Sequence, residues 1–218
     1  MKKAKVLFVS QDITPYLDET FVGKIARKLP QGIQERGKEI RTFMPRYGNI
    51  NERRHQLHEV IRLSGMNMVI NDVDHPLIIK VASIPSARMQ VYFIDNEEYF
   101  IRKASLTDKT SGKYFDDNDE RAMFFVRGVA ETVKKLGWQP DIIHCHGWFT
   151  SLMPLYIKKH YSDDPLFADT KIIVSLYEDE FPKNLNKKFI DKLSFDGFSK
   201  KDLKHLAEEP SYLNMIKQ

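Results

Sequence analysis

The sequence predicts an α/β domain, with a Rossmann-like, three-layer arrangement around a mostly parallel sheet. Two observations predict it. Short apolar runs typical of buried parallel strands alternate with longer segments in which apolar residues recur at helical spacing. Strand–helix units of this length favour right-handed crossovers, with helices on both faces of the sheet. The expected strands are 5–10, 39–45, 140–146 and 171–177, and the expected long helices are 21–35, 118–136 and 148–160.

The expected helices have recognisable ends. Gly37 and Gly137 follow the apolar patterns of the first two helices and predict C-terminal stops. Pro30 falls inside the first helix and is expected to kink or interrupt it. Short helical pieces are expected at 189–193, 200–208 and 211–217. Since the last pattern is uncapped where the sequence stops, we expect residues 1–218 to be one domain of a longer chain.

The middle of the chain, residues 57–96, changes character. Short β-prone runs are separated by turn residues such as Gly65 and Pro85. This pattern predicts a β-hairpin insertion that leaves the main sheet in antiparallel pairs. The insertion is expected either to be plain scaffold or to dock a partner.

Composition excludes several classes of function. The 218 residues carry a formal net charge of +4, with no basic block that would indicate nucleic-acid binding. No apolar stretch is long enough to cross a bilayer, so no membrane association is expected. Cys145 is the one cysteine, which rules out an internal disulfide and indicates a cytoplasmic protein. No motif predicts a cofactor.

The loop between the first strand and first helix lies where α/β domains cradle phosphate groups, because backbone N–H groups and the helix dipole point there. Here it is a degenerate phosphate loop, since acidic and bulky residues replace most of the glycines. A carboxylate at about 4–6 Å would oppose a diphosphate by on the order of 1–4 kcal/mol. The alternative is that the acids and the threonine simply begin a helix with no ligand. The residues concerned are Asp18, Glu19, Thr20, Phe21 and Gly23.

Aromatic residues gather near the expected carboxyl ends of the strands, where open α/β sheets bind ligands. Tyr16, Trp148, Phe149 and Tyr177 could stack on sugar rings, although core packing explains Trp148 equally well. No metal site is expected. His144 and His146 point to one face of their strand and Cys145 to the other, and a solvated patch explains His55 and His58.

Several segments, in order, resemble the N-terminal domain of bacterial glycogen synthases and plant starch synthases, glycosyltransferase family 5. The resemblance covers nearly the whole chain. Its family counterparts include an "LPRYG" segment, a "DN-x-x-RF-x-FF" helix start and a "PDVVHAHDWHT" strand end. The matching segments here are KVLFVS at 5–10, MPRYG at 44–48, VYFIDN at 91–96, DNDER at 117–121 and PDIIHCHGWFT at 140–150.

This resemblance implies the N-terminal half of a GT-B fold. The family transfers glucose from ADP-glucose to the 4-hydroxyl end of an α-1,4-glucan. The N-terminal domain mainly holds the glucan, and the C-terminal domain, which we expect to be absent from this chain, grips most of the nucleotide sugar. The substrate-binding candidates that the resemblance implies are Asp117, Asn118, Arg121, His146, Trp148 and Tyr177. Asp117 could equally be a helix N-cap.

The sequence also departs from the family pattern. The family's K-[TV]-G-G-L-G loop falls on 18–23, so that Asp18 replaces the lysine and Thr20 and Phe21 replace paired glycines. Phe149 replaces a histidine that lies near the sugar in the family, and Tyr177 replaces another. A phenyl ring cannot hydrogen-bond a sugar hydroxyl as an imidazole does.

Three hypotheses follow. The first is the acceptor-side half of a glycogen synthase, inactive as this chain and using ADP-glucose only with a second domain. The second is a non-catalytic glucan-binding or regulatory relative that binds maltooligosaccharides. The third is a protein-interaction domain on the same scaffold.

Overall fold

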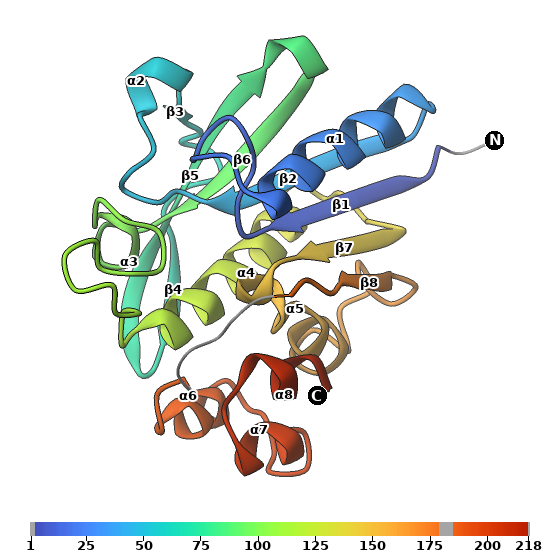
Figure 1. Cartoon of the computed structure of the whole chain (residues 1–218). Helices are drawn as coiled ribbons and strands as arrows, with labels where there is room; N and C mark the ends of the chain where they lie inside the picture. The colour runs from blue at the N-terminus through green and yellow to red at the C-terminus, as the bar shows by residue number, and fades with distance from the viewer. Residues whose placement is uncertain (1–2, 179–184, 218) are drawn as a thin grey trace.

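A mostly parallel sheet forms the centre of the computed structural model, which describes residues 3–178 and 185–217. Within that part of the chain the sheet has eight strands in the order β3-β5-β6-β2-β1-β7-β8, with β4 paired to β5 (Figure 1). The strands are β1 (Lys5–Ser10), β2 (Glu39–Pro45), β3 (His58–Glu59), β4 (Met66–Ile70), β5 (Val73–Ile84), β6 (Met89–Asp95), β7 (Ile142–His146) and β8 (Lys171–Ser175).

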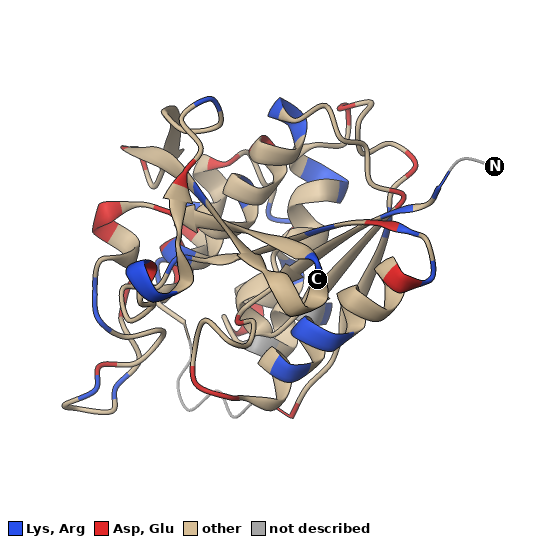
Figure 2. Ribbon diagram, turned by 90° about the horizontal axis from the view of Figure 1, so that it is seen from above, with Lys and Arg blue, Asp and Glu red and all other residues tan. Residues whose placement is uncertain are grey.

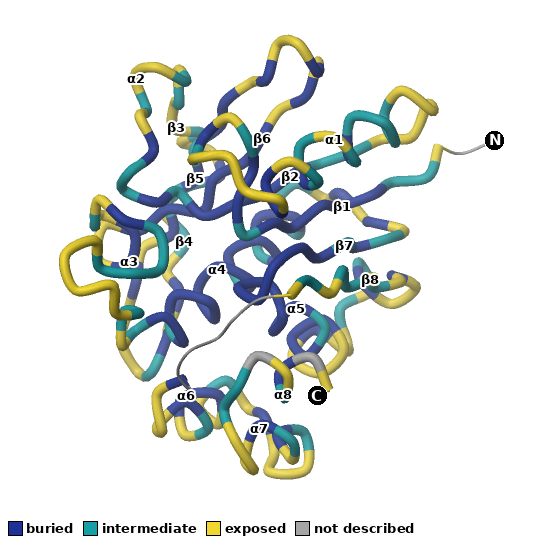
Figure 3. The backbone as a smooth tube through the Cα atoms, viewed as in Figure 1, coloured by how far each residue is buried: buried dark blue, intermediate teal, exposed yellow. Residues whose placement is uncertain are grey.

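The parallel part of the sheet confirms the predicted Rossmann-like α/β fold. β1 lies between β2 and β7, and β8 continues the sheet beyond β7, all in parallel. Leu7 and Val9 are fully buried, as a central strand covered on both faces requires. β8 is more exposed than β1 and β7 (Figure 3). It ends at Ser175, its last partner to β7, so the strand is shorter than the predicted 171–177 and Tyr177 lies just past it.

The hairpin prediction for residues 57–96 needs correction. β4, β5 and β6 pair antiparallel in sequence, as expected. However, β6 pairs in parallel with β2, so these hairpins extend the main sheet instead of leaving it. The physical reason is burial: Val91, Phe93 and Ile94 of β6 are fully buried and need cover from both faces.

Two long helices cover opposite faces of the sheet (Figure 1). Helix α1 (Phe21–Glu35) packs on β1 and β2, and α4 (Asn118–Lys135) packs on β2, β4 and β6. Helix α1 runs through Pro30 without the interruption that the sequence suggested. Gly37 and Gly137 both have positive φ just after these helices, confirming the predicted stops.

The predicted helix at 148–160 forms as three short pieces. They are a 3-10 turn (Trp148–Thr150), α5 (Met153–Leu155) and a π-helical turn (Tyr156–His160). Pro154 lies at the start of α5 and has no N–H to donate to the preceding turn. Proline therefore explains the break between the 3-10 turn and α5.

Short helices complete the described chain. They are α2 (Glu52–His55), α3 (Glu97–Phe100), the 3-10 turn Pro85–Ala87, and α6 (Phe189–Phe195), α7 (Lys204–Glu208) and α8 (Tyr212–Lys217) in the predicted C-terminal region. None of the described helices is long and apolar enough to span a bilayer. Basic and acidic residues are interspersed along helices and loops (Figure 2).

Candidate functional site

A pocket of about 460 Å³ lies at the carboxyl end of β1, beside the start of α1 and the segment after β8. This is the edge of a parallel sheet at which α/β domains bind ligands. We call it the α1 pocket. It is lined by Gln11, Asp12, Thr20, Phe21, Val22, Leu176, Tyr177 and Glu178.

The start of α1 is closed by its own side chains. Thr20 is the N-cap, and its Oγ1 accepts a hydrogen bond from the backbone N–H of Gly23 at 2.8 Å. The same hydroxyl donates to Oδ2 of Asp12 at 2.8 Å. A Cβ on Gly23 would lie 3.0 to 3.1 Å from Thr20, Asp12 and Thr14. The predicted helix-start role of Thr20 is therefore confirmed.

Two aromatic rings stand in the wall of the α1 pocket. Phe21 is 70% exposed, and its ring meets Tyr177 edge-on with centroids 6.1 Å apart. Tyr177 is half-buried. Rings presented in this way offer apolar faces to a ligand. Phe21, noted in the sequence only for its bulk, is thus an exposed aromatic group of the pocket.

His146, a buried residue of β7, contacts Tyr177 from outside the pocket lining. Its Nδ1 lies 2.6 Å from the Tyr177 hydroxyl, and its ring lies 4.2 Å from that of His144, centroid to centroid. His144 Nε2 in turn lies 2.8 Å from Oγ of Ser175. The two histidines share one face of β7, as the alternation predicted, and the pair ties β7 to the end of β8.

Burial keeps His146 neutral. The side chain is fully buried, and desolvation, with a smaller effect from His144, lowers the pKa of His146 to about 3. Its Nε2 is buried without a hydrogen-bond partner among the described residues. At neutral pH this imidazole is therefore an uncharged group that orients Tyr177 rather than an acid.

The other predicted sugar-stacking rings lie in the core. Tyr16, Trp148 and Phe149 are at most 4% exposed. Phe149 packs against Phe125, with centroids 5.8 Å apart, and Trp148 packs against Phe149. Of the four aromatic candidates, the structure therefore places only Tyr177 in the α1 pocket.

Asp18 and Glu19 face a different pocket. It also measures about 460 Å³ and lies on the other side of the 14–19 loop, where Asn51, Arg54 and Lys109 also line it. Glu19 forms an exposed ion pair with Lys24 at 3.0 Å. The residues of the degenerate phosphate loop are thus divided, with Thr20 and Phe21 in one pocket and the two acids in the other.

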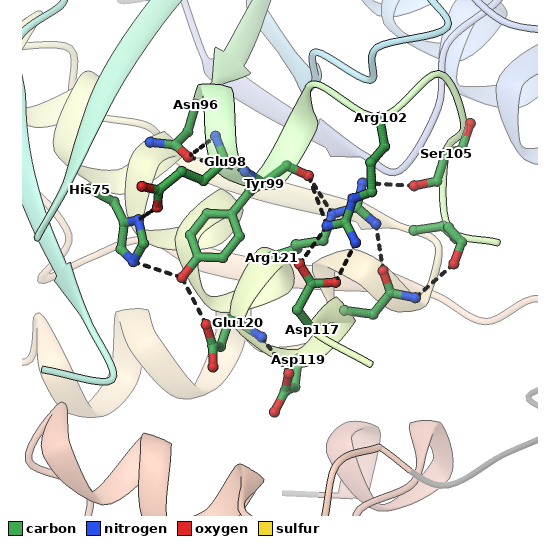
Figure 4. A network of polar contacts seen from close by, with 12 residues as sticks. His75, Asn96, Glu98, Tyr99, Arg102, Ser105, Asp117, Asp119, Glu120 and Arg121 are labelled. Carbon is green, nitrogen blue, oxygen red and sulfur yellow. Dashed lines mark hydrogen bonds and ion pairs between the residues drawn. The ribbon is translucent and has the colours of Figure 1, made fainter. Parts of the chain in front are cut away.

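The matched residues at the start of α4 have protein partners (Figure 4). Arg102 Nη1 donates to Oδ1 of Asp117 at 2.9 Å, and its Nη2 pairs with the other carboxylate oxygen. Asp117 makes no side-chain cap, so the N-cap hydrogen bond that its position suggested does not form. Asn118 donates to the backbone oxygen of Leu106 at 2.9 Å.

Arg121 is the centre of that network. It is fully buried and donates to the carbonyl oxygens of Tyr99 at 2.8 Å and Ser105 at 2.7 Å, and to Oδ1 of Asn118 at 2.5 Å. Burial lowers the pKa of Arg121 to about 10, so the guanidinium stays charged at neutral pH. Asp117, Asn118 and Arg121 are therefore brought together, but not with His146 and Tyr177.

No group of three or more His, Cys, Asp or Glu residues in the described ranges 3–178 and 185–217 has metal-binding geometry. Cys145 is fully buried, and desolvation raises the pKa of its thiol to about 12.

Gly147 follows the end of β7. It has a φ of +84°, and a Cβ there would lie 2.7 Å from Gln11. The turn after β7 thus requires a glycine at the position where the family pattern has an acid.

Comparison with known proteins identifies the family. The sequence profile of the starch synthase catalytic domain matches residues 5–218. The chain belongs to this family. A glycogen synthase of Chlorobium limicola is 40% identical over 173 residues, covering 79% of this chain and 35% of the relative. A glycogen synthase of Chlorobaculum parvum is 34% identical over 218 residues, covering 97% of this chain and 45% of the relative.

A solved structure supports the fold. The catalytic domain of starch synthase IV from Arabidopsis thaliana, bound to ADP and acarbose, superposes with a TM-score of 0.68 at 19% identity. That match covers 79% of this chain and 34% of the plant chain. The chain is a glycogen and starch synthase-like glycosyltransferase domain of GT-B type that spans less than half the length of these relatives.

Besides Val22 of α1, sequence reasoning missed four residues of the α1 pocket: Gln11, Asp12, Leu176 and Glu178. Their signal was positional. Each lies within three residues of the carboxyl end of β1 or β8, the edge where ligands gather in this class of sheet.

Proposed function

We propose that this domain binds the non-reducing end of an α-1,4-glucan at the α1 pocket and acts as the acceptor-side half of a glucosyltransferase. The observation that carries the proposal is the pairing of Tyr177 and Phe21 in a pocket at the ligand edge of a glycogen synthase-like domain. Their rings would pack against sugar faces. The amide of Gln11 and the carboxylate of Glu178 supply hydrogen-bonding groups for hydroxyls.

The donor would be ADP-glucose, gripped by a second domain. The chain spans 35% of the Chlorobium limicola relative, and the plant neighbour is described as bound to ADP and acarbose. We propose that this chain alone does not turn over, because glucosyl transfer depends on positioning both substrates. The buried thiol of Cys145 suits a reducing compartment, and we place the protein in the cytoplasm.

The start of α1 favours a second candidate, a non-catalytic glucan-binding or regulatory domain. Thr20 Oγ1 accepts the N–H of Gly23 and donates to the carboxylate of Asp12, so one backbone N–H and one hydroxyl that could hold phosphate are engaged within the chain. Phe21 adds bulk at the same place. In this second candidate, the domain still binds glucan at the α1 pocket but no longer binds a pyrophosphate at the start of α1.

Calorimetry with maltoheptaose tests the shared claim of glucan binding. We expect saturable binding, weakened in Phe21→Ala and unchanged in Phe195→Ala, which removes an equally exposed ring elsewhere. Absence of binding at millimolar sugar would reject both candidates and leave the protein-interaction hypothesis.

Transfer of radiolabelled glucose from ADP-glucose to glycogen separates the two candidates. The assay compares this chain with the same chain joined to the C-terminal domain of a glycogen synthase relative. Incorporation by the joined protein supports the acceptor-side enzyme. Glucan binding without incorporation supports the non-catalytic domain.

A further inference from the structure

A second pocket lies at the opposite edge of the sheet, near the amino-terminal end of β2. Its volume is about 540 Å³, within the range of small-molecule sites. The start of β2, the tip of the β5–β6 hairpin and the last turns of α1 form its walls. We call it the hairpin pocket. The residues used below are Gln34, Arg41, Arg88, Gln90 and Tyr92, and its described lining contains no carboxylate.

The hairpin tip is fastened to α1, so the pocket has a defined wall. Gln34 Nε2 donates to the backbone oxygen of Arg88 at 3.1 Å. Arg27 Nη2 donates to Oγ of Ser86 at 3.0 Å. Figure 1 shows the hairpin tip rising beside α1. Two contacts from one helix to one turn hold Arg88 at the rim.

Arg41 is held in place without an ion pair. Its guanidinium lies 5.5 Å from the ring centre of Tyr92 and 5.3 Å from that of Trp138, and Nη1 donates to the Tyr92 hydroxyl at 2.5 Å. Its Nε is buried with no hydrogen-bond partner among the residues described. The nearby carboxylate of Glu39 accepts from the Trp138 indole instead.

The hairpin pocket differs from several other cationic sites of the described chain. At those sites half-buried or buried cations pair with carboxylates: Arg46 and Lys80 with Asp95, Arg102 with Asp117, Arg127 with Asp196, and Lys192 with Asp119. In the described ranges, neither Arg41 nor Arg88 has a carboxylate within ion-pair distance. The hairpin pocket therefore presents two guanidinium groups that form no ion pair with the described chain.

The pocket also holds an unsatisfied acceptor. Oε1 of Gln34 is buried without a hydrogen-bond partner among the described residues. A fully ionised anionic group would satisfy the arginines but not this oxygen, because such a group has no proton to donate. A ligand that carries both an anionic group and hydroxyls would satisfy both, since unmade buried hydrogen bonds are costly.

We propose that the hairpin pocket binds a small phosphate monoester with a hydroxyl-bearing body, such as a sugar phosphate. The guanidinium groups of Arg41 and Arg88 donate hydrogen bonds to the phosphate, for which they are suited. Oε1 of Gln34 accepts a hydrogen bond from a hydroxyl of the ligand. The volume accommodates a body of hexose size beyond the phosphate. Because the pocket lies at the edge opposite the α1 pocket, this ligand would not compete with glucan.

Calorimetry tests this with three probes: fructose 6-phosphate, inorganic phosphate and fructose. We expect fructose 6-phosphate to bind, inorganic phosphate to bind more weakly, and fructose not to bind. Arg88→Gln removes one charged hydrogen bond and should weaken fructose 6-phosphate about tenfold. Arg62→Gln, which removes an equally exposed charge elsewhere, should leave its affinity unchanged.

The outcomes are distinct. No saturable binding of either phosphate at millimolar concentration, or equal weakening by both variants, would overturn the site. Equal affinity for fructose 6-phosphate and inorganic phosphate would overturn the hydroxyl-bearing body. Maltoheptaose binding should be the same in Arg88→Gln and the parent chain, so failure here is separable from failure of the glucan proposal. Unchanged melting temperatures show that the exposed variants fold.

Discussion

The starts of the two long helices behave in opposite ways. At α4, Asp117, Asn118 and Arg121 match the family pattern, and each is engaged by other parts of the chain. At α1, residues 18–23 depart from the pattern, and Thr20 and Phe21 line an open pocket. At these two helix starts, the retained residues hold the scaffold together and two of the replaced residues line a pocket.

This contrast separates two meanings of a matched motif. The α4 network joins the 99–106 segment to the helix, and Lys192 of α6 reaches its neighbours Asp119 at 2.6 Å and Glu120 at 2.8 Å. Tyr99 adds a hydrogen bond to Glu120 at 2.9 Å. Such a network preserves a fold whether or not the domain turns over. The α1 pocket, by contrast, is where the proposed function is located.

The largest effect is expected at Arg121. Arg121→Met leaves the carbonyls of Tyr99 and Ser105 and the amide of Asn118 without their donor inside the core. We expect the free energy of unfolding to fall by about 3 kcal/mol or more, measured by urea denaturation. Arg62→Met, at an exposed site, is the control. A loss below about 1 kcal/mol would contradict the structural role of the α4 network.

The next effect is a pH dependence from His146, the buried partner of Tyr177. His146 has a pKa of about 3 in the folded domain, against about 6.5 when unfolded. Between these pH values the unfolded chain binds more protons than the folded domain. The contribution of His146 to the free energy of unfolding is therefore fully present above about pH 6.5, and it falls as the pH drops, by up to about 1.4 kcal/mol per pH unit. Urea denaturation at pH 7.5 and 5 should show a shallower loss in His146→Gln. Equal losses would contradict a neutral, buried His146.

A smaller effect is expected at the α1 cap. Thr20→Ala removes the acceptor for the Gly23 N–H and should lower the free energy of unfolding by about 1 kcal/mol. Thr110→Ala, at an exposed threonine outside a helix, should change it by less than about 0.5 kcal/mol. Thermal unfolding of both variants measures the difference. If the two proved equal, Thr20 would not be closing the helix start.

The smallest effect is on glucan affinity. Phe21→Ala removes one exposed ring worth about 0.5–1.5 kcal/mol, so maltoheptaose affinity should fall about two- to twelvefold with no change in melting temperature. Phe195→Ala, 64% exposed on α6, should leave affinity unaltered. An unaffected Phe21→Ala would move the sugar site away from the α1 pocket.

Much of the fold could be predicted because its signals are local. The apolar run of β1, the helical spacing of α1 and the glycines after α1 and α4 each determine structure within a few residues. The place of β6 could not be predicted in this way. Its parallel pairing with β2 links Val91 to Thr42, about fifty positions apart in the sequence, and no local pattern encodes that choice.

The site was less predictable for a similar reason. Their position at the carboxyl edge of the sheet indicated Tyr177 and Thr20, and both line the α1 pocket. It did not reveal that Trp148 and Phe149 turn into the core, because burial depends on the packing of α4 against the turn after β7. Nor could the sequence show that the Arg121 guanidinium would donate its hydrogen bonds to backbone carbonyls of the 99–105 segment.

The central claim is that the start of α1 no longer binds a diphosphate, because the Thr20 cap and the Phe21 side chain occupy the place of the phosphate loop. Crystals soaked with ADP-glucose and, separately, with maltoheptaose test this most directly. We predict sugar density against Phe21 and Tyr177 in the second soak, and none for a pyrophosphate along residues 20–23 in the first. A pyrophosphate bound to the backbone there, with the Thr20 hydrogen bond to Gly23 broken, would contradict it.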